Sequence, residues 1–176
     1  LAFAGQIFCD FAGYSLCAIG VAMCLGFSLP DNFRFPYGAV GFSDFWRRWH
    51  ITLSTWLRDY LYIPLGGNRK GAARALANLV ITMFLGGLWH GARWTFVAWG
   101  VLHGLYLVLE CLLQRVVPET VRRPWIVRLL LAVGTFTAIN LAWVFFRAET
   151  FAQAFALLQA MFGWVSDDAT RVLTTV

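Results

Sequence analysis

The chain has 176 residues, of which 60% are hydrophobic and only 13% are charged, and it carries 16 Phe and 9 Trp. A soluble domain of this length would need more polar side chains to cover its surface, so the composition places the chain in a membrane. The net charge of +5 is modest and forms no nucleic-acid footprint, so no nucleic-acid partner is expected.

The first 29 residues form a nearly continuous apolar run, interrupted by Asp10. A bilayer span takes about 20 apolar residues, so this run predicts a transmembrane helix. A loop is predicted from Pro30 to Pro36, where prolines, Asp and Asn break helical structure. The chain starts at Leu1 without a signal-peptide pattern, and we expect it to be a C-terminal portion of a longer protein.

The four cysteines lie within apolar stretches and lack the close paired spacing of zinc or redox sites. They are expected to be small buried hydrophobic residues. Neither they nor the histidines form a metal-binding motif such as HExxH, so no metal site is predicted.

A helix is predicted from Ser43 to about Tyr62. Ser43 and Asp44 are typical of a helix start, and Pro64 with the following glycines ends it. At about 100° per residue, one face is apolar and the opposite face is polar, with His50 on the border between them. The pattern indicates an amphipathic helix that lies along the membrane surface or re-enters it. The apolar face comprises Trp46, Trp49, Leu53, Trp56, Leu57 and Tyr60, and the polar face Arg47, Ser54 and Arg58.

Two basic loops frame the middle of the chain and indicate the cytoplasmic side. The intervening residues 75–113 must then cross an even number of times, and their length fits two helices with Arg93 near the turn. The basic residues are Arg69, Lys70 and Arg74 in the first loop, and Arg115, Arg122, Arg123 and Arg128, against one acid, Glu119, in the second.

A further span is predicted at residues 127–146, followed by an amphipathic interfacial helix over residues 151–162. No repeat or linker divides the chain. The expected fold is therefore all-α: one polytopic membrane bundle over residues 1–176, with interfacial or re-entrant helices.

His90 is the strongest candidate for chemistry. It lies between Gly86–Gly87 and Gly91, which permit close approach of a substrate or of another backbone, and Trp89 can wall a pocket. An imidazole suits proton transfer near neutral pH. No nucleophile motif accompanies it, which favours direct transfer between two bound substrates with His90 activating a hydroxyl. His103 would not share its face on one helix, and either contacts substrate or fixes helix packing.

Three segments carry a family resemblance: "DFWRRWHITLSTWLRDYLYIPLGGNRKG" (44–71), "NLVITMFLGGLWHGARWTFVAWGVLHG" (78–104) and "AWVFFRAETFAQA" (142–154). Together they resemble the membrane-bound O-acyltransferase (MBOAT) family, specifically its bacterial branch of alginate O-acetyltransferase membrane subunits. The resemblance implies a helical bundle around a tunnel in the bacterial inner membrane. Relatives commonly read "GYSD" where this chain has Gly13-Tyr14-Ser15-Leu16.

The resemblance also implies residue roles. His90, in "LWHG", would be the catalytic base, and His50, in "RRWH", the second active-site residue that positions the donor or stabilises the oxyanion. Four basic residues are candidates for binding an anionic donor such as acetyl-CoA: Arg47, Arg58, Arg69 and Lys70. Trp89 and His103 are candidates for the substrate path. No tightly bound cofactor is implied. The basic residues could equally mark topology alone.

Three functions remain open at this point. The first is O-acetylation of an exported polysaccharide such as alginate, either directly or through a periplasmic acetyltransferase partner. The second is transfer of D-alanyl or another acyl group to a cell-wall polymer. The third is a channel or transporter subunit in which Asp10, His50 and His90 line a polar path, although the runs lack inverted-repeat symmetry.

Overall fold

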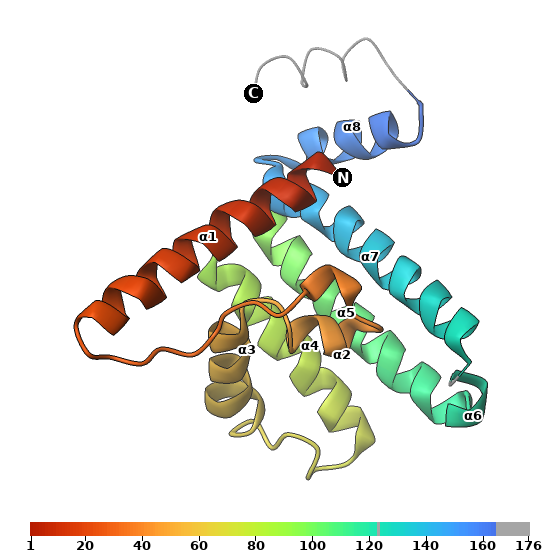
Figure 1. Cartoon of the computed structure of the whole chain (residues 1–176). Coiled ribbons are helices and arrows are strands. Elements are labelled where there is room, and N and C mark those ends of the chain that lie inside the picture. Colours follow the sequence, from red (N-terminus) through yellow and green to blue (C-terminus); the bar gives the residue numbers. More distant parts are fainter. Residues whose placement is uncertain (123, 165–176) are drawn as a thin grey trace.

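The computed structural model describes residues 1–122 and 124–164 and shows helices with no strand in that part of the chain. The elements in chain order are α1 (Ala2–Cys24), η1 (Pro36–Gly38), α2 (Phe42–Trp46), α3 (Ile51–Leu57), η2 (Arg58–Tyr62), α4 (Ala72–Trp89), α5 (Trp94–Val116), α6 (Glu119–Arg122), α7 (Trp125–Arg147) and α8 (Phe151–Met161). Figure 1 shows α4 and α5 crossing below α1 and α7 running beside α5, with α8 and α6 at opposite ends of α7. The expectation of an all-α bundle is confirmed.

Four of the described helices, α1, α4, α5 and α7, are long and apolar enough to cross a membrane. They include the predicted N-terminal span, the two helices predicted within residues 75–113, and the predicted span at 127–146. Arg93 lies at the turn, where it precedes the first residue of α5. The prediction of buried cysteines is wrong, because Cys9, Cys17 and Cys24 are exposed on α1 and Cys111 is partly exposed. A thiol tolerates an apolar exterior, so apolar neighbours in sequence do not imply burial.

The predicted continuous helix from Ser43 to Tyr62 is wrong. The chain forms α2, then a turn, then α3 and the π-helical turn η2. The break falls at His50, which has left-handed backbone angles (φ 44°, ψ 55°) and so interrupts the helical ladder. As a result the predicted apolar face is divided: Trp49 is buried, whereas Trp56 and Tyr60 are exposed.

Ser43 does not cap the helix start, contrary to the prediction. Its own backbone N–H donates to Glu110 Oε2 on α5 at 2.8 Å, and Val40 N–H donates to Asp44 Oδ2 at 3.0 Å. Gly41 N–H donates to Thr135 Oγ1 on α7 at 3.0 Å. The amides around the start of α2 are therefore satisfied by Asp44 of α2 itself and by side chains of α5 and α7, and the bonds to α5 and α7 position the segment that leads to His50.

The α4–α5 pair is packed backbone against backbone at three glycines. A Cβ added at Gly87 would collide with the carbonyl oxygen of Phe96, and one at Gly100 with the carbonyl oxygen of Met83. Gly104 faces Val80 in the same way. Small residues of this kind allow membrane helices to approach closely. The glycine before His90 thus admits another backbone, one of the two possibilities that the sequence left open.

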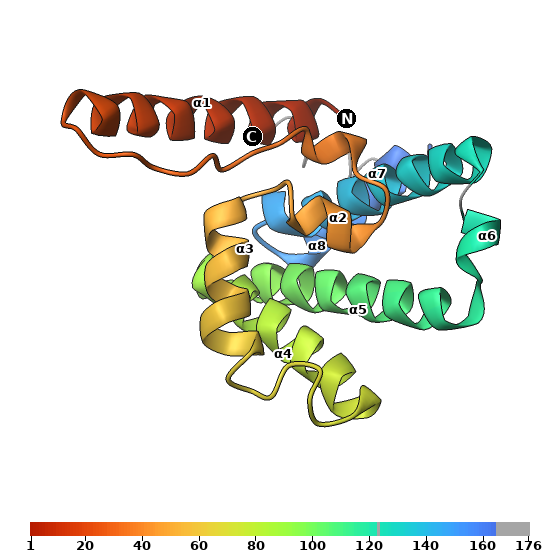
Figure 2. The same ribbon diagram turned by 60° about the horizontal axis from the view of Figure 1, so that its bottom comes forward.

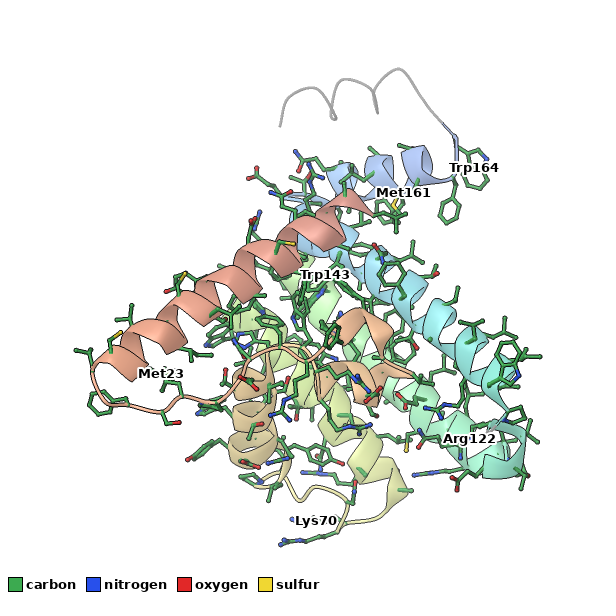
Figure 3. The ribbon with its side chains drawn as sticks, viewed as in Figure 1. Met23, Lys70, Arg122, Trp143, Met161 and Trp164 are labelled. Atoms are coloured by element: carbon green, nitrogen blue, oxygen red, sulfur yellow. The ribbon has the colours of Figure 1, made fainter. Side chains whose placement is uncertain are left out.

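The core is aromatic and lies where α1, α2, α5 and α7 meet. Figure 2 shows α1 and the loop after it on one side, the α4–α5 pair on the other, and α2 between them. Trp143 points into this interior below α1 (Figure 3), whereas Lys70 lies at the tip of the loop before α4. The buried residues of this core are Ala4, Ala39, Phe45, Trp49, Trp99, Ile139, Ala142 and Trp143.

Candidate active site

His50 is held by a hydrogen-bond network that begins in the loop after α1. Its Nδ1 lies 3.2 Å from Asn32 Oδ1, which also accepts from Thr52 Oγ1 at 3.0 Å. The Asn32 amide nitrogen in turn donates to Ser15 Oγ on α1 at 3.1 Å. Because Asn32 Oδ1 is an acceptor, His50 Nδ1 must carry the proton, and Nε2 is left with a free lone pair.

This network involves two residues that the sequence analysis did not single out. Asn32 lies in a predicted loop, and Ser15 belongs to the "GYSL" segment that departs from the common "GYSD" pattern. Ser15 is buried although it sits on a helix whose other residues are mostly exposed. A serine within an apolar run and an Asn in the following loop were the available signals in the sequence, but only the structure joins them to His50.

His90 lies directly after α4, in the turn before α5, and aromatic rings surround it. Trp89 and Trp99 lie edge-on to its imidazole, with ring centroids 5.0 and 5.2 Å away. Phe146 of α7 lies 5.1 Å away and Phe96 of α5 lies 6.1 Å away. The imidazole is partly buried, and the tight glycine packing of α4 on α5 places it against these rings.

The structure brings His50 and His90 together across Trp89. The Trp89 ring contacts both imidazoles, at 6.1 Å from His50 and 5.0 Å from His90. Burial lowers the pKa of His90 to about 4, and burial followed by repulsion from His90 lowers the pKa of His50 to about 4. Both imidazoles are therefore neutral at pH 7, the form that can accept a proton or a hydrogen bond.

His103 is fully buried in α5, and neither of its ring nitrogens has a hydrogen-bond partner among the described residues. It contacts Trp46 and Trp99, with centroids 5.1 and 4.7 Å away. Trp99 in turn contacts His90, so His103 reaches the candidate site only through that indole. A role in direct substrate contact remains a prediction.

Arg47 and Arg58 lie on the surface, beside carboxylates. The Arg47 side chain is 70% exposed and lies 3.6 Å from Asp44. The Arg58 guanidinium makes two hydrogen bonds to Asp59, at 2.7 and 3.2 Å, and lies beyond the end of α3 from His50. The structure thus groups His50, Trp89 and His90, and does not bring these two arginines into that group.

A cavity of about 390 Å³ lies at the other end of α5 from His90. Its lining includes Glu110 and Thr135, which anchor α2, and Arg122 and Arg128 at the predicted cytoplasmic side. Figure 3 shows Arg122, the last residue of α6, far along the bundle from Trp143. In the described part of the chain, no three His, Cys, Asp or Glu side chains come together as a metal site.

Comparison with known proteins agrees with these features. Residues 1–147 match the membrane-bound O-acyltransferase (MBOAT) family. A probable alginate O-acetylase of Azotobacter vinelandii is 45% identical over 99% of this chain and 35% of its own length. A peptidoglycan O-acetyltransferase of Helicobacter pylori is 45% identical over 93% of this chain and 31% of its own length.

A teichoic acid D-alanyltransferase of Streptococcus thermophilus is 37% identical over 60% of this chain and 27% of its own length. The chain thus spans about a third of the length of the curated relatives it matches. The family match covers the four long apolar helices, the His50 turn and the His90 turn. The chain therefore belongs to the membrane-bound O-acyltransferase family.

Proposed function

We propose that the protein to which this chain belongs is an O-acyltransferase that acetylates an exported polysaccharide, with His90 as general base. The observation that carries the proposal is the pairing of two neutral, partly buried histidines across Trp89. The relatives named as acetylating enzymes align over 93–99% of the chain, which supports an acetyl group as the cargo.

The chemistry balances without a covalent enzyme intermediate. His90 accepts the proton of an acceptor hydroxyl as that oxygen attacks the thioester carbonyl of the donor. The carbon–oxygen bond forms, the carbon–sulfur bond breaks, and the proton then passes from His90 to the departing thiolate. His90 is neutral before and after the cycle, in agreement with its low pKa.

His50 is proposed to position the acceptor. Its Nδ1–H is engaged by Asn32, so the free lone pair on Nε2 can accept a hydrogen bond from a sugar hydroxyl. This assignment favours orientation of a hydroxyl over stabilisation of the oxyanion, because an unprotonated Nε2 has no hydrogen to donate. Orientation by a fixed group can account for much of an enzyme's rate.

Acetyl-CoA is proposed as the donor, delivered from the cytoplasmic side of the inner membrane. The loop that precedes α4 and the one that follows α5 lie at the same end of the antiparallel α4–α5 pair, and both are basic. Phosphate groups of CoA suit such a surface. Arg69 and Lys70 fit this role better than Arg58, whose guanidinium is engaged by Asp59.

D-alanyl transfer is the second candidate within the family. The D-alanyltransferase relative aligns over 60% of the chain, against 93–99% for the acetylating relatives, so we rank it lower. A channel or transporter role has weaker support. Asp10, a candidate for lining the polar path, lies exposed on α1.

The test uses the full-length parent protein in its own membranes, supplied with radiolabelled acetyl-CoA. Label should enter polysaccharide with the wild type and fall to background with His90→Ala and His90→Gln at equal protein level. His50→Ala should lose most transfer, and Gln159→Ala, an exposed α8 change, should keep it. Full transfer without the His90 imidazole would rule out the proposed base. No transfer of label from acetyl-CoA, together with incorporation of radiolabelled D-alanine into a cell-wall polymer in a parallel assay, would favour the second candidate.

A further inference from the structure

The ring of Phe146 offers a fixed wall beside His90. Phe146 lies 5.1 Å from the His90 imidazole and is only partly buried. Three other rings pack against it: Phe96 at 5.1 Å, Trp99 at 5.3 Å and Trp143 at 5.3 Å. Trp89, on another side of the imidazole, is 60% exposed and lacks that support from the core.

The reacting carbonyl must come close to the His90 imidazole, which Phe146 borders. A base contacts the hydroxyl at about 2.6–3.2 Å, and the hydroxyl oxygen approaches the carbonyl carbon at about 3–3.5 Å. The carbonyl carbon therefore lies within about 6 Å of the base nitrogen, a distance comparable to the 5.1 Å between the ring centroids of His90 and Phe146. An acetyl group ends one bond beyond that carbon, whereas a longer acyl chain adds bonds of about 1.5 Å each.

Resting on the proposed acyl transfer at His90, we propose that Phe146, backed by Phe96 and Trp99, sets the upper limit on acyl-chain length and selects acetyl over longer acyl groups. Phe146 would contact the terminal methyl of the acetyl group. A butyryl group would have to displace a ring that is packed on three others. Packed interiors resist such displacement, because each close contact must be relieved elsewhere.

Phe145 provides a matched control on the same helix. It precedes Phe146 by one residue and points to a different neighbour, with its ring 6.4 Å from Phe155 of α8. No stacking between Phe145 and His90 occurs among the described residues. Phe145→Ala and Phe146→Ala each remove one phenyl ring from α7, but only Phe146 borders the His90 imidazole. Differences between the two variants therefore report on the wall and not on general loosening of α7.

The experiment measures transfer from labelled acetyl-CoA and butyryl-CoA by full-length protein in membranes. Discrimination in an apolar pocket is about 10–200-fold for each methylene, so the wild type should prefer acetyl by at least about 100-fold. Phe146→Ala should raise the butyryl-to-acetyl ratio at least about tenfold, and Phe146→Leu should raise it less. Phe145→Ala should leave the ratio unchanged.

An unchanged ratio in both Phe146 variants, with acetyl transfer still measurable, would overturn the proposal. If Phe146→Ala does not accumulate, the ratio for Phe146→Leu decides in the same way. A wild type that transfers both groups equally also contradicts it, whereas a wild type that transfers neither defeats the proposed acyl transfer itself. The two failures are thus distinguishable.

Discussion

Replacing Gly87 by alanine tests whether backbone contact between α4 and α5 positions His90. The added Cβ would collide with the carbonyl oxygen of Phe96 and lie 3.2 Å from the Cα of Gly100. Neither atom belongs to a side chain that can rotate away, so the two helices must separate. Overpacking costs typically about 1–3 kcal/mol. A clash with backbone atoms belongs at the upper end of that range, at about 3 kcal/mol.

Alanine also favours the helix over glycine by about 1 kcal/mol. The free energy of unfolding should therefore fall by a net of about 2 kcal/mol. Gly86→Ala is the matched control, because its Cβ would meet only the end of the Leu57 side chain, at 3.2 Å, which can move. Gly86→Ala should thus be close to neutral.

Denaturant titration of the full-length protein in detergent measures both variants, and acetyl transfer in membranes measures the consequence for the site. His90 follows Gly87 by three residues, so separating the helices displaces the imidazole, and a shift of about 1 Å can cost about 100-fold in rate. A Gly87→Ala protein as stable and active as the Gly86→Ala protein would refute the reasoning.

Three further predictions follow from the site and its surroundings. Since the pKa values of His50 and His90 are about 4, acetyl transfer should stay level from pH 8 to 5 and fall to half near pH 4; an acid limb centred near 6.5 would contradict the neutral pair. The unfolded imidazoles bind protons from about pH 6.5, so the free energy of unfolding should decrease as pH falls from 6.5 to 4 and level off below. Asn32→Ala removes the acceptor of His50 Nδ1–H and should lower transfer about 100-fold, with Asn32→Asp retaining more because it keeps Oδ1; equal activities of the two variants would count against the tautomer assigned to His50. The Thr150 side chain caps α8 by accepting from Gln153 N–H at 3.2 Å. Thr150→Ala removes this cap and should destabilise α8 by about 1 kcal/mol, measured as faster amide exchange in that helix. Thr150→Ser keeps the hydroxyl and should not change the exchange.

Much of the secondary structure could be predicted from the sequence, because apolar length depends on local composition. The runs that became α1, α4, α5 and α7 are each long and apolar enough to cross a bilayer, and the polar turn at Arg93 separates the middle pair. The amphipathic segment after Thr150 likewise predicted α8, where Thr150 and Gln153 form a capping box. His90 and His50 were singled out by residue type, setting and family resemblance.

Tertiary structure alone decided how these residues meet. The break at His50 requires a left-handed backbone at a histidine. Helical periodicity cannot predict this break, because the contacts that accompany it come from Asn32, Glu110 and Thr135, which are distant in sequence. The rings around His90 come from α4, α5 and α7, and Phe146 of α7 lies more than fifty residues after His90 in the sequence. Long-range packing of that kind leaves no periodic trace in the sequence. Composition thus determined which segments are membrane helices, while the close approach of α4 and α5 at Gly87 determined where the imidazole lies and what surrounds it.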